Sequence, residues 1–529
     1  MVDKISKAQV AQPGGDTIFG EGTEPNKSQV SFAHRSKRGS RSCPASVSRT
    51  YHLPKAVRLP NGCTTTQKML KLCVLSVLLC LLVPSQGSTP GTVVRVNQEA
   101  LEYVCQQGKP SLLRGLMVIQ IPNFMSPRTI IGSLLKVVGI RVLNAQLPHL
   151  SVKLIPRTGV QLSLSAQLHI RGSVLIAPVE LRVGSSILLD VRVTRSPHGF
   201  PILSVTACKS LLGDVDILLG GSNLLGFLKP LQNHIRAVLV DKMCLSLSSV
   251  VLGLNARLGT LVGLNSINPM SSLQYAMMED PEITEDYIDL DLNAVIALMG
   301  KPVDFETAGP LPPFSLPPPE TVSDDSMVNM GLSEHLFASL FASLEQSGAL
   351  NLQIGGHSSH LTTSMLEQAI PSISKRYPQA VALMLNVVVS KLPIISFHEG
   401  AAILRLSPAI QVGVAESGSF QQSQALFTLG VDLSLAVKLD VTITSLHLTV
   451  AVHGDVGLEV ESSSVEITEI SYLRRVILSE FQDAFLAHVN AALSVGISLP
   501  KLSNVQYIEP EIEIHEGYAQ VNCDLDYQP

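Results

Sequence analysis

Tryptophan is absent from this 529-residue sequence, and aromatic residues make up only 4% of it. Charged residues are also scarce at 15%, whereas hydrophobic residues, most of them aliphatic, reach 46%. A soluble chain with so much aliphatic content either has a very large core or encloses something apolar.

Catalytic motifs are missing as well. The sequence has no Gly-x-Ser-x-Gly nucleophile elbow, phosphate loop, dinucleotide fingerprint, His-Glu-x-x-His zinc helix or Cys-x-x-Cys pair. His357 and His360 are spaced like metal ligands, but no further ligand lies near them in the sequence, which favours a solvated loop. We therefore expect no enzyme, no metal site, no cofactor and no nucleic-acid partner.

A run of apolar residues over 69–83 has a basic start at Lys68 and Lys71, and a small-residue pattern that ends at Gly87 follows it. The run is short for a bilayer span, so it predicts a secretory signal peptide over 69–87. A buried core helix and a signal anchor are the alternatives. The chain after the cleavage site should be secreted, without a transmembrane segment, into an oxidising compartment.

Residues 1–68 are rich in Ser, Gly, Pro, Lys and Arg and contain few apolar clusters. Such a composition buries too little surface to offset chain entropy, which predicts a disordered leader. Because a signal peptide so far inside a chain is abnormal, we expect Met69 to be the working start and the leader to be missing from the mature protein.

Charge divides the remaining chain into two regions. Residues 88–270 hold 17 basic and 7 acidic residues, whereas residues 271–529 hold 9 basic and 32 acidic ones. A cationic first region suggests contact with anionic surfaces such as lipid headgroups. Mutual attraction of the two regions, or scattered charges, are the alternatives.

The first region repeats a plan that the second also follows: an opening helix, alternating strands and a closing helix. The opening helix is predicted over 93–118, with Gly108 and Pro110 breaking or kinking it. Strands are predicted over 160–170, 182–195 and 201–208, because apolar and polar residues alternate there. The closing helix is predicted over 221–245. Candidate buried positions in the two helices are Val94, Leu101, Val104, Leu113, Leu224, Leu228, Leu231, Ile235 and Val238.

In the second region the opening helix is predicted over 332–350, from leucines that recur every four residues at Leu332, Leu336, Leu340 and Leu344. Strands follow over about 381–463, with a turn or bulge at Thr444 and Ser445, where the apolar parity changes. The closing helix is predicted over 469–495, with Gly496 at its C-cap. Its buried stripe should contain Leu473, Ile477, Phe481, Phe485, Val489 and Leu493.

Between the regions, Gly309 to Pro319 includes six prolines, which predicts a stiff extended connector, with a proline-rich recognition ligand as the alternative. The predicted domains are 88–300 and 325–529, joined by a linker over 301–324. Twisted strands with a long helix against them suggest two rolled sheets plugged by helices. The apolar seam left between helix and sheet would hold an acyl chain at roughly 0.8 kcal/mol for each buried methylene.

Four cysteines follow the predicted signal, Cys105, Cys208, Cys244 and Cys523, and they allow three pairings. A bridge between Cys208 and Cys244 would attach the closing helix of the first region to its strands. It would close a loop of about 35 residues and contribute about 3–4 kcal/mol in the chain-entropy model.

Four features together resemble the family of bactericidal/permeability-increasing protein and lipopolysaccharide-binding protein, in particular its long PLUNC members. They are the start Ser88-Thr89-Pro90-Gly91-Thr92-Val93-Val94-Arg95, the Cys208 and Cys244 pair, the proline connector, and Gly331-Leu332-Ser333-Glu334. The resemblance implies an α+β fold of two similar antiparallel β-barrel domains, each with packed amphipathic helices, joined by a central β-sheet into an elongated boomerang. It also implies a Cys208–Cys244 disulfide and an apolar pocket for phospholipid acyl chains in each barrel.

One segment departs from the family pattern. Bactericidal members carry many lysines at the tip of the first barrel, whereas 171–178 here has one cation and the apolar run Val174, Leu175 and Ile176. That run would dip into an acyl layer if exposed, or pack inside as an ordinary strand end.

The resulting hypothesis is a secreted protein that holds phospholipid or lipopolysaccharide-like amphiphiles, with the resemblance implying mucosal innate defence. The protein would need no cofactor, and the small molecule bound to it would be a phospholipid. The alternative is an extracellular protein whose cationic first half binds anionic bacterial or glycan surfaces without extracting lipid. The candidate pocket residues are Leu101, Val104, Leu113, Leu332, Leu336 and Leu340.

Overall fold

The structure is a computed structural model that describes residues 91–130, 133–174, 177–219, 222–223, 229–304, 314–318, 326–355, 360–414 and 425–528. Gln86–Pro529 form one compact unit. The predicted leader (1–68) and signal peptide (69–87) lie outside the described residues.

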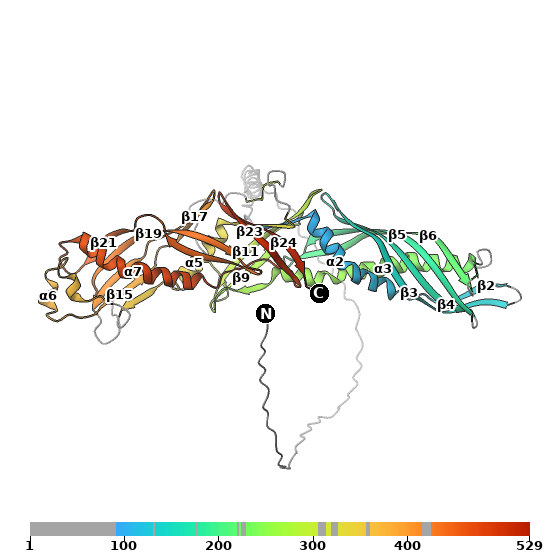
Figure 1. The fold of residues 1–529 in the computed structure, drawn as a ribbon, viewed down its shortest axis with the longest axis horizontal. Helices are drawn as coiled ribbons and strands as arrows, with labels where there is room; N and C mark the ends of the chain where they lie inside the picture. Colours follow the sequence, from blue (N-terminus) through green and yellow to red (C-terminus); the bar gives the residue numbers. More distant parts are fainter. Residues whose placement is uncertain are drawn as a thin grey trace, which may run out of the picture. The chain divides into compact units, whose positions relative to one another are not determined.

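A nine-stranded antiparallel sheet, the central sheet, combines strands from both halves of the chain. Its main order is β23-β24-β13-β1-β11-β9-β8, so the first strand of the unit lies between one strand of each half. Figure 1 labels β9, β11, β23 and β24 of this sheet. The strands are β1 (Thr92–Asn97), β8 (Leu264–Ser266), β9 (Ser271–Met277), β10 (Glu282–Ile283), β11 (Tyr287–Leu298), β12 (Lys301–Pro302), β13 (Val328–Ser333), β23 (Val505–His515) and β24 (Tyr518–Tyr527).

The start of the first predicted helix was wrong. Residues 92–97 form β1, and helix α2 spans Gln98–Met117. The sequence Thr-Val-Val-Arg-Val at the start of β1 is rich in β-branched residues, which fit a pleated strand better than a helix. Pro110 lies inside α2 without ending it. Both Pro110 and Gln106, whose carbonyl the proline leaves without a helical donor, are exposed, which lowers the cost of the missing bond.

The first half forms a six-stranded antiparallel sheet in the order β2-β3-β4-β5-β6-β7. The predicted strands are confirmed, and each is longer than its sequence pattern indicated. Helices α2 and α3 lie against this sheet, α2 along β3 and α3 along β6 (Figure 1). The elements are β2 (Phe124–Ile130), β3 (Ser133–Ile155), β4 (Gly159–Val174), β5 (Ala177–Arg195), β6 (Pro201–Leu219), β7 (Ser222–Asn223), α3 (Lys229–Gly253), α4 (Asn255–Leu258) and η1 (Gly259–Val262).

The second half also curls an antiparallel sheet of nine strands around its helices, and its longest strand, β19, pairs with four others. The predicted turn at residues 444–445 is confirmed, since β19 ends at Val441 and β20 begins at Ser445. The elements are α5 (Glu334–Gln346), β14 (Leu352–Gly355), η4 (Thr363–Leu366), α6 (Ile373–Arg376), β15 (Leu383–Val388), β16 (Ile394–His398), β17 (Ala401–Leu406), β18 (Ala409–Val414), β19 (Ala425–Val441), β20 (Ser445–Val452), β21 (Gly457–Ser463), α7 (Ile470–Leu493) and β22 (Ile497–Ser498).

Part of the proline-rich connector lies on the central sheet. Arg95 of β1 forms a buried bidentate ion pair with Asp289 of β11, at 2.7 and 2.8 Å, and also donates to the carbonyls of Leu316 and Pro317. A Cβ atom on Gly331 would lie 2.8 Å from Leu316 Cδ2, so only glycine leaves room for the connector there. The described part, 314–318, is therefore bound to the fold along its length, which the prediction of a stiff spacer did not include.

One helical segment of the described chain, Lys229–Val262, is long and apolar enough to cross a membrane by length and composition. Length and composition alone do not make this helix a membrane span, so the absence of a transmembrane segment from the mature chain stays a prediction. The apolar residues of this segment surround the helix instead of forming a continuous run, and only 22% of its most apolar stretch is buried. A stripe from Leu231 to Val251 nevertheless packs on the first-half sheet, and a disulfide joins Cys244 to Cys208 of β6.

Candidate lipid-binding site

Helices α2 and α3 touch closely at one point and separate from it. Ser246 of α3 donates to the carbonyl of Gly115, and a Cβ atom on Gly115 would lie 3.0 Å from Val250. From there, α2 leads back to the central sheet, where the backbone N–H of Gln98 donates to the backbone carbonyl of Asp286 at 2.8 Å. The small residue at the crossing thus allows close contact at one end only.

Toward the central sheet, α2 and the segment that follows α3 are attached to different strands. The side chains of Gln98 and Gln106 donate to β3 carbonyls, those of Val152 and Leu150. Directly after α3, the side chain of Asn255 bonds both backbone groups of Leu203 on β6. Because β4 and β5 lie between β3 and β6, α2 and this segment diverge over these two strands.

Apolar side chains between α2 and the segment after α3 are only partly buried. The inward residues of β4 and β5 farther along the sheet, such as Leu168 and Val183, are each 2% exposed. The inward residues of β4 and β5 near the central sheet are more exposed, although their side chains point to the same side of the sheet. We call this set of partly buried residues the α2–α3 seam: Leu101, Cys105, Val160, Val193, Leu203 and Val205.

The seam carries no charge of its own. Its one titratable member is Cys105, and burial together with the nearby Glu102 raises the pKa of this thiol to about 11. The thiol is therefore protonated and neutral at physiological pH, and it behaves as a small hydrophobic group. An uncharged, half-covered apolar strip of this kind suits a hydrocarbon chain.

The predicted pocket residues fall in two different environments. In α2, Leu101 and Leu113 are partly buried, but Val104 is 44% exposed, so its predicted burial was wrong. The helix turns this side chain away from the sheet. In the second half, Leu332, Leu336 and Leu340 are buried in the core. Their assignment as lipid contacts stays a prediction. Leu332 lies in β13 and α5 begins at Glu334, so the start of the helix predicted over 332–350 was wrong.

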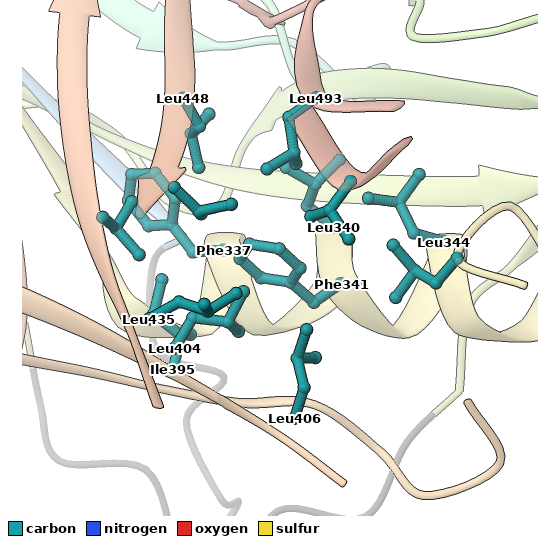
Figure 2. Packing of buried hydrophobic residues seen from close by; sticks show 14 of the residues in the cluster. Phe337, Leu340, Phe341, Leu344, Ile395, Leu404, Leu406, Leu435, Leu448 and Leu493 are labelled. Carbon is teal, nitrogen blue, oxygen red and sulfur yellow. The ribbon is translucent and has the colours of Figure 1, made fainter. Parts of the chain in front are cut away.

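The interior of the second half is filled by α5 and its neighbours. Phe337 and Phe341 are fully buried, and the Phe337 ring lies 4.8 Å from that of Phe397 between centroids. Figure 2 shows side chains from several strands and from α7 surrounding α5. The labelled residues are Phe337, Leu340, Phe341, Leu344, Ile395, Leu404, Leu406, Leu435, Leu448 and Leu493.

At the predicted membrane tip, Val174 is the last residue of β4 and is partly buried. Leu175 and Ile176 lie outside the described residues. The single cation of this segment, Arg171, faces Glu180 across the hairpin at 3.8 Å. The tip therefore offers little unpaired positive charge, in agreement with the departure noted in the sequence.

Two other features are unsuited to an acyl chain or a metal. A surface depression of about 490 Å³ is lined by 156–157 and 281–285, which include Arg157, Glu282 and Glu285, and its polar lining suits water. Within the described ranges, no group of three or more His, Cys, Asp or Glu residues has the geometry of a metal site. His360 is exposed, and His357 lies outside the described residues.

Two halves of curled antiparallel sheet, each with helices against it and joined by a shared central sheet, define a lipid-binding protein class. Two family models match the chain: LBP / BPI / CETP family, N-terminal domain, over 100–256, and LBP / BPI / CETP family, C-terminal domain, over 265–527. The chain belongs to the LBP / BPI / CETP family. The resemblance stated from the sequence is thereby confirmed, and with it the fold.

Similar proteins support this assignment. "BPI fold-containing family B member 2" of Homo sapiens is 39% identical over 460 residues, which cover 86% of this chain and 98% of that protein. The Mus musculus protein of the same name is 36% identical, with 83% and 95% covered. A crystal structure of lipopolysaccharide binding protein aligns with a TM-score of 0.55 and 22% identity, covering 84% of this chain and all of the other. Family members are non-enzymatic lipid-binding proteins, so the expectation that this chain is not an enzyme is confirmed.

Proposed function

We propose that the protein is secreted and holds phospholipid or a lipopolysaccharide-like amphiphile, with an acyl chain in the α2–α3 seam. The observation that supports it is the set of partly exposed apolar residues between α2 and the segment after α3, which diverge toward the central sheet. Covering them with a hydrocarbon chain is favourable by roughly 0.8 kcal/mol for each buried methylene. A role in mucosal innate defence rests on relatives named for bactericidal activity and lipopolysaccharide binding.

A second acyl site at Leu332, Leu336 and Leu340 is the weaker part of this proposal. These residues already contact a dense core, so a chain there would have to displace side chains. The number of lipid molecules bound per protein chain distinguishes one occupied site from two.

Secretion is supported by the anatomy of residues 69–87 and by the Cys208–Cys244 bridge, since disulfides persist mainly in oxidising compartments. N-terminal sequencing of protein collected from culture medium tests it. We expect a start close to Ser88, and protein retained inside the cells would contradict secretion.

The lipid site is tested by a substitution that fills the seam. We expect delipidated wild-type protein to bind added phospholipid in native mass spectrometry and Leu101→Trp to bind at least tenfold less. Met117→Trp is the matched control, because Met117 lies on the same helix and is 45% exposed. Wild-type protein that takes up no phospholipid would reject the function, and an unaffected Leu101→Trp variant would reject the seam.

The alternative function, binding of anionic surfaces without lipid extraction, is favoured by the 17 basic against 7 acidic residues over 88–270. Salt separates the two functions, because electrostatic surface binding is screened by ions whereas acyl burial is not. Steep loss of vesicle binding with salt, without lipid in the purified protein, would favour the alternative.

A further inference from the structure

Toward the C-terminal end of α3, the side that faces away from the sheet is apolar, whereas nearer its N-terminal end this side carries exposed polar residues such as Asn233, Arg236 and Asp241. A surface helix normally presents polar residues outward, opposite its buried stripe. Here Leu245 and Leu252 of α3 are 63% and 50% exposed, and Leu254, directly after the helix, is 39% exposed. We call these three residues the outer α3 face.

Charge near the outer α3 face is mainly positive along the sequence. The exposed Lys242 and Arg257 are the only charged residues over 242–278 and stand on either side of the three leucines, although the exposed Asp241 precedes Lys242 and Arg257 also donates to the hydroxyl of Tyr527. Exposed leucines between cations are the arrangement of helices that lie in the interface of an anionic membrane.

The outer α3 face is also continuous with the proposed site. The helix that carries Leu245 and Leu252 forms one wall of the α2–α3 seam, through its contacts with β6 and with Gly115 of α2. A lipid passing from a bilayer into the seam would therefore follow the same helix instead of crossing water.

We propose that the outer α3 face docks on the surface of a lipid bilayer that contains anionic phospholipid, with its leucines entering the boundary between headgroups and acyl chains. The docked face would supply lipid to the α2–α3 seam. This supply step, but not the docking itself, rests on the proposed function. It assigns the membrane contact to the helix layer, whereas the sequence had pointed to the tip at 174–176.

The test is flotation of the full chain with phosphatidylcholine vesicles, with and without phosphatidylglycerol. We expect Leu245→Glu with Leu252→Glu to lower vesicle binding at least tenfold, and phosphatidylglycerol to strengthen wild-type binding. The matched control is Ile470→Glu with Val495→Glu, two residues of the second half that are each 52% exposed. Circular dichroism verifies that both variants fold.

Wild-type binding by the α3 double variant would overturn the inference, as would equal loss in the control. A changed oligomeric state in light scattering, with vesicle binding unchanged, would assign the face to a second copy of the chain and also overturn it. Uptake of a short-chain phospholipid from solution distinguishes the two proposals. A variant that takes up this lipid but does not float supports docking, whereas a wild-type protein that floats without taking up lipid rejects only the proposed function.

Discussion

Helices α5 and α2 open the two halves of the chain, yet their surroundings differ. Eight of the 13 residues of α5 are buried, whereas four of the 20 residues of α2 are. Strands and α7 surround α5 with side chains, while α2 packs mainly on β3 and α3.

The difference shows that a repeated plan does not mean a repeated pocket. In the second half, phenylalanine and leucine side chains occupy the interior that a ligand would need (Figure 2). In the first half, α2 and α3 hold fewer large side chains inward and leave apolar surface uncovered. We therefore expect stability to depend more on the second interior and lipid contact more on the first.

The largest expected effect is in the second interior. Phe341→Ala should lower the free energy of unfolding by about 3–5 kcal/mol, because it leaves a cavity beside fully buried neighbours. Denaturant titration measures it, with Phe341→Leu as a milder variant if the alanine form does not fold. Leu113→Ala on α2, where the side chain is only partly buried, should cost much less. Equal losses would contradict the contrast between the halves.

The disulfide should have the next largest effect, because it restricts the unfolded chain between β6 and α3. Replacing Cys208 and Cys244, which are 36 residues apart, with serine should lower the free energy of unfolding by about 2–4 kcal/mol. Thermal unfolding of the oxidised protein and the double variant measures the difference. The same Tm in both proteins would show that the packed stripe alone holds α3.

The smallest expected effect is at the central sheet, which belongs to both halves. Partial desolvation and the carboxylates of Asp289, Glu282 and Glu279 raise the pKa of Asp291 to about 6 from its ordinary 3.8. The folded protein thus holds this proton more tightly than the unfolded chain, and stability falls as pH rises between the two values.

Asp291→Asn should therefore stabilise the protein above pH 6, by less than about 1 kcal/mol because the residue is exposed, and leave it unchanged below pH 3.8. Denaturant midpoints across this pH range measure the gain. A gain that is the same at every pH would assign it to packing and not to the carboxylate.

Much of the fold was predictable where local patterns decide it. The buried stripe of α7 was predicted residue by residue, and Gly496, with φ +75°, adopts the left-handed conformation expected after the helix. For α3, the predicted Leu231 and Ile235 are buried, but Leu224 and Leu228 lie outside the described residues and Val238 is partly exposed. The helix was predicted to end at 245 but runs to Gly253. The apolar residues after 245 gave no sign in the sequence of where the helix ends.

Contacts between distant segments were not predictable. The seam depends on Gly115 meeting Val250, which is 135 positions away in the sequence, and no local pattern encodes where two helices touch. The same holds for 314–318 against Gly331, where a proline-rich composition predicted extension but not attachment. The exposure of Val104 could not be predicted either, because the sequence alone does not distinguish an exposed apolar helix residue from a buried one.

The position of β1 in the central sheet also affects how the chain folds while it is being synthesised. Its two neighbours are β11 and β13, and β13 pairs in turn with β24, at the far end of the chain. A nascent chain that has emerged only as far as residue 300 contains the whole first-half sheet but still shows an open edge of β1. Such edges recruit other strands, so we expect chains truncated before residue 333 to aggregate.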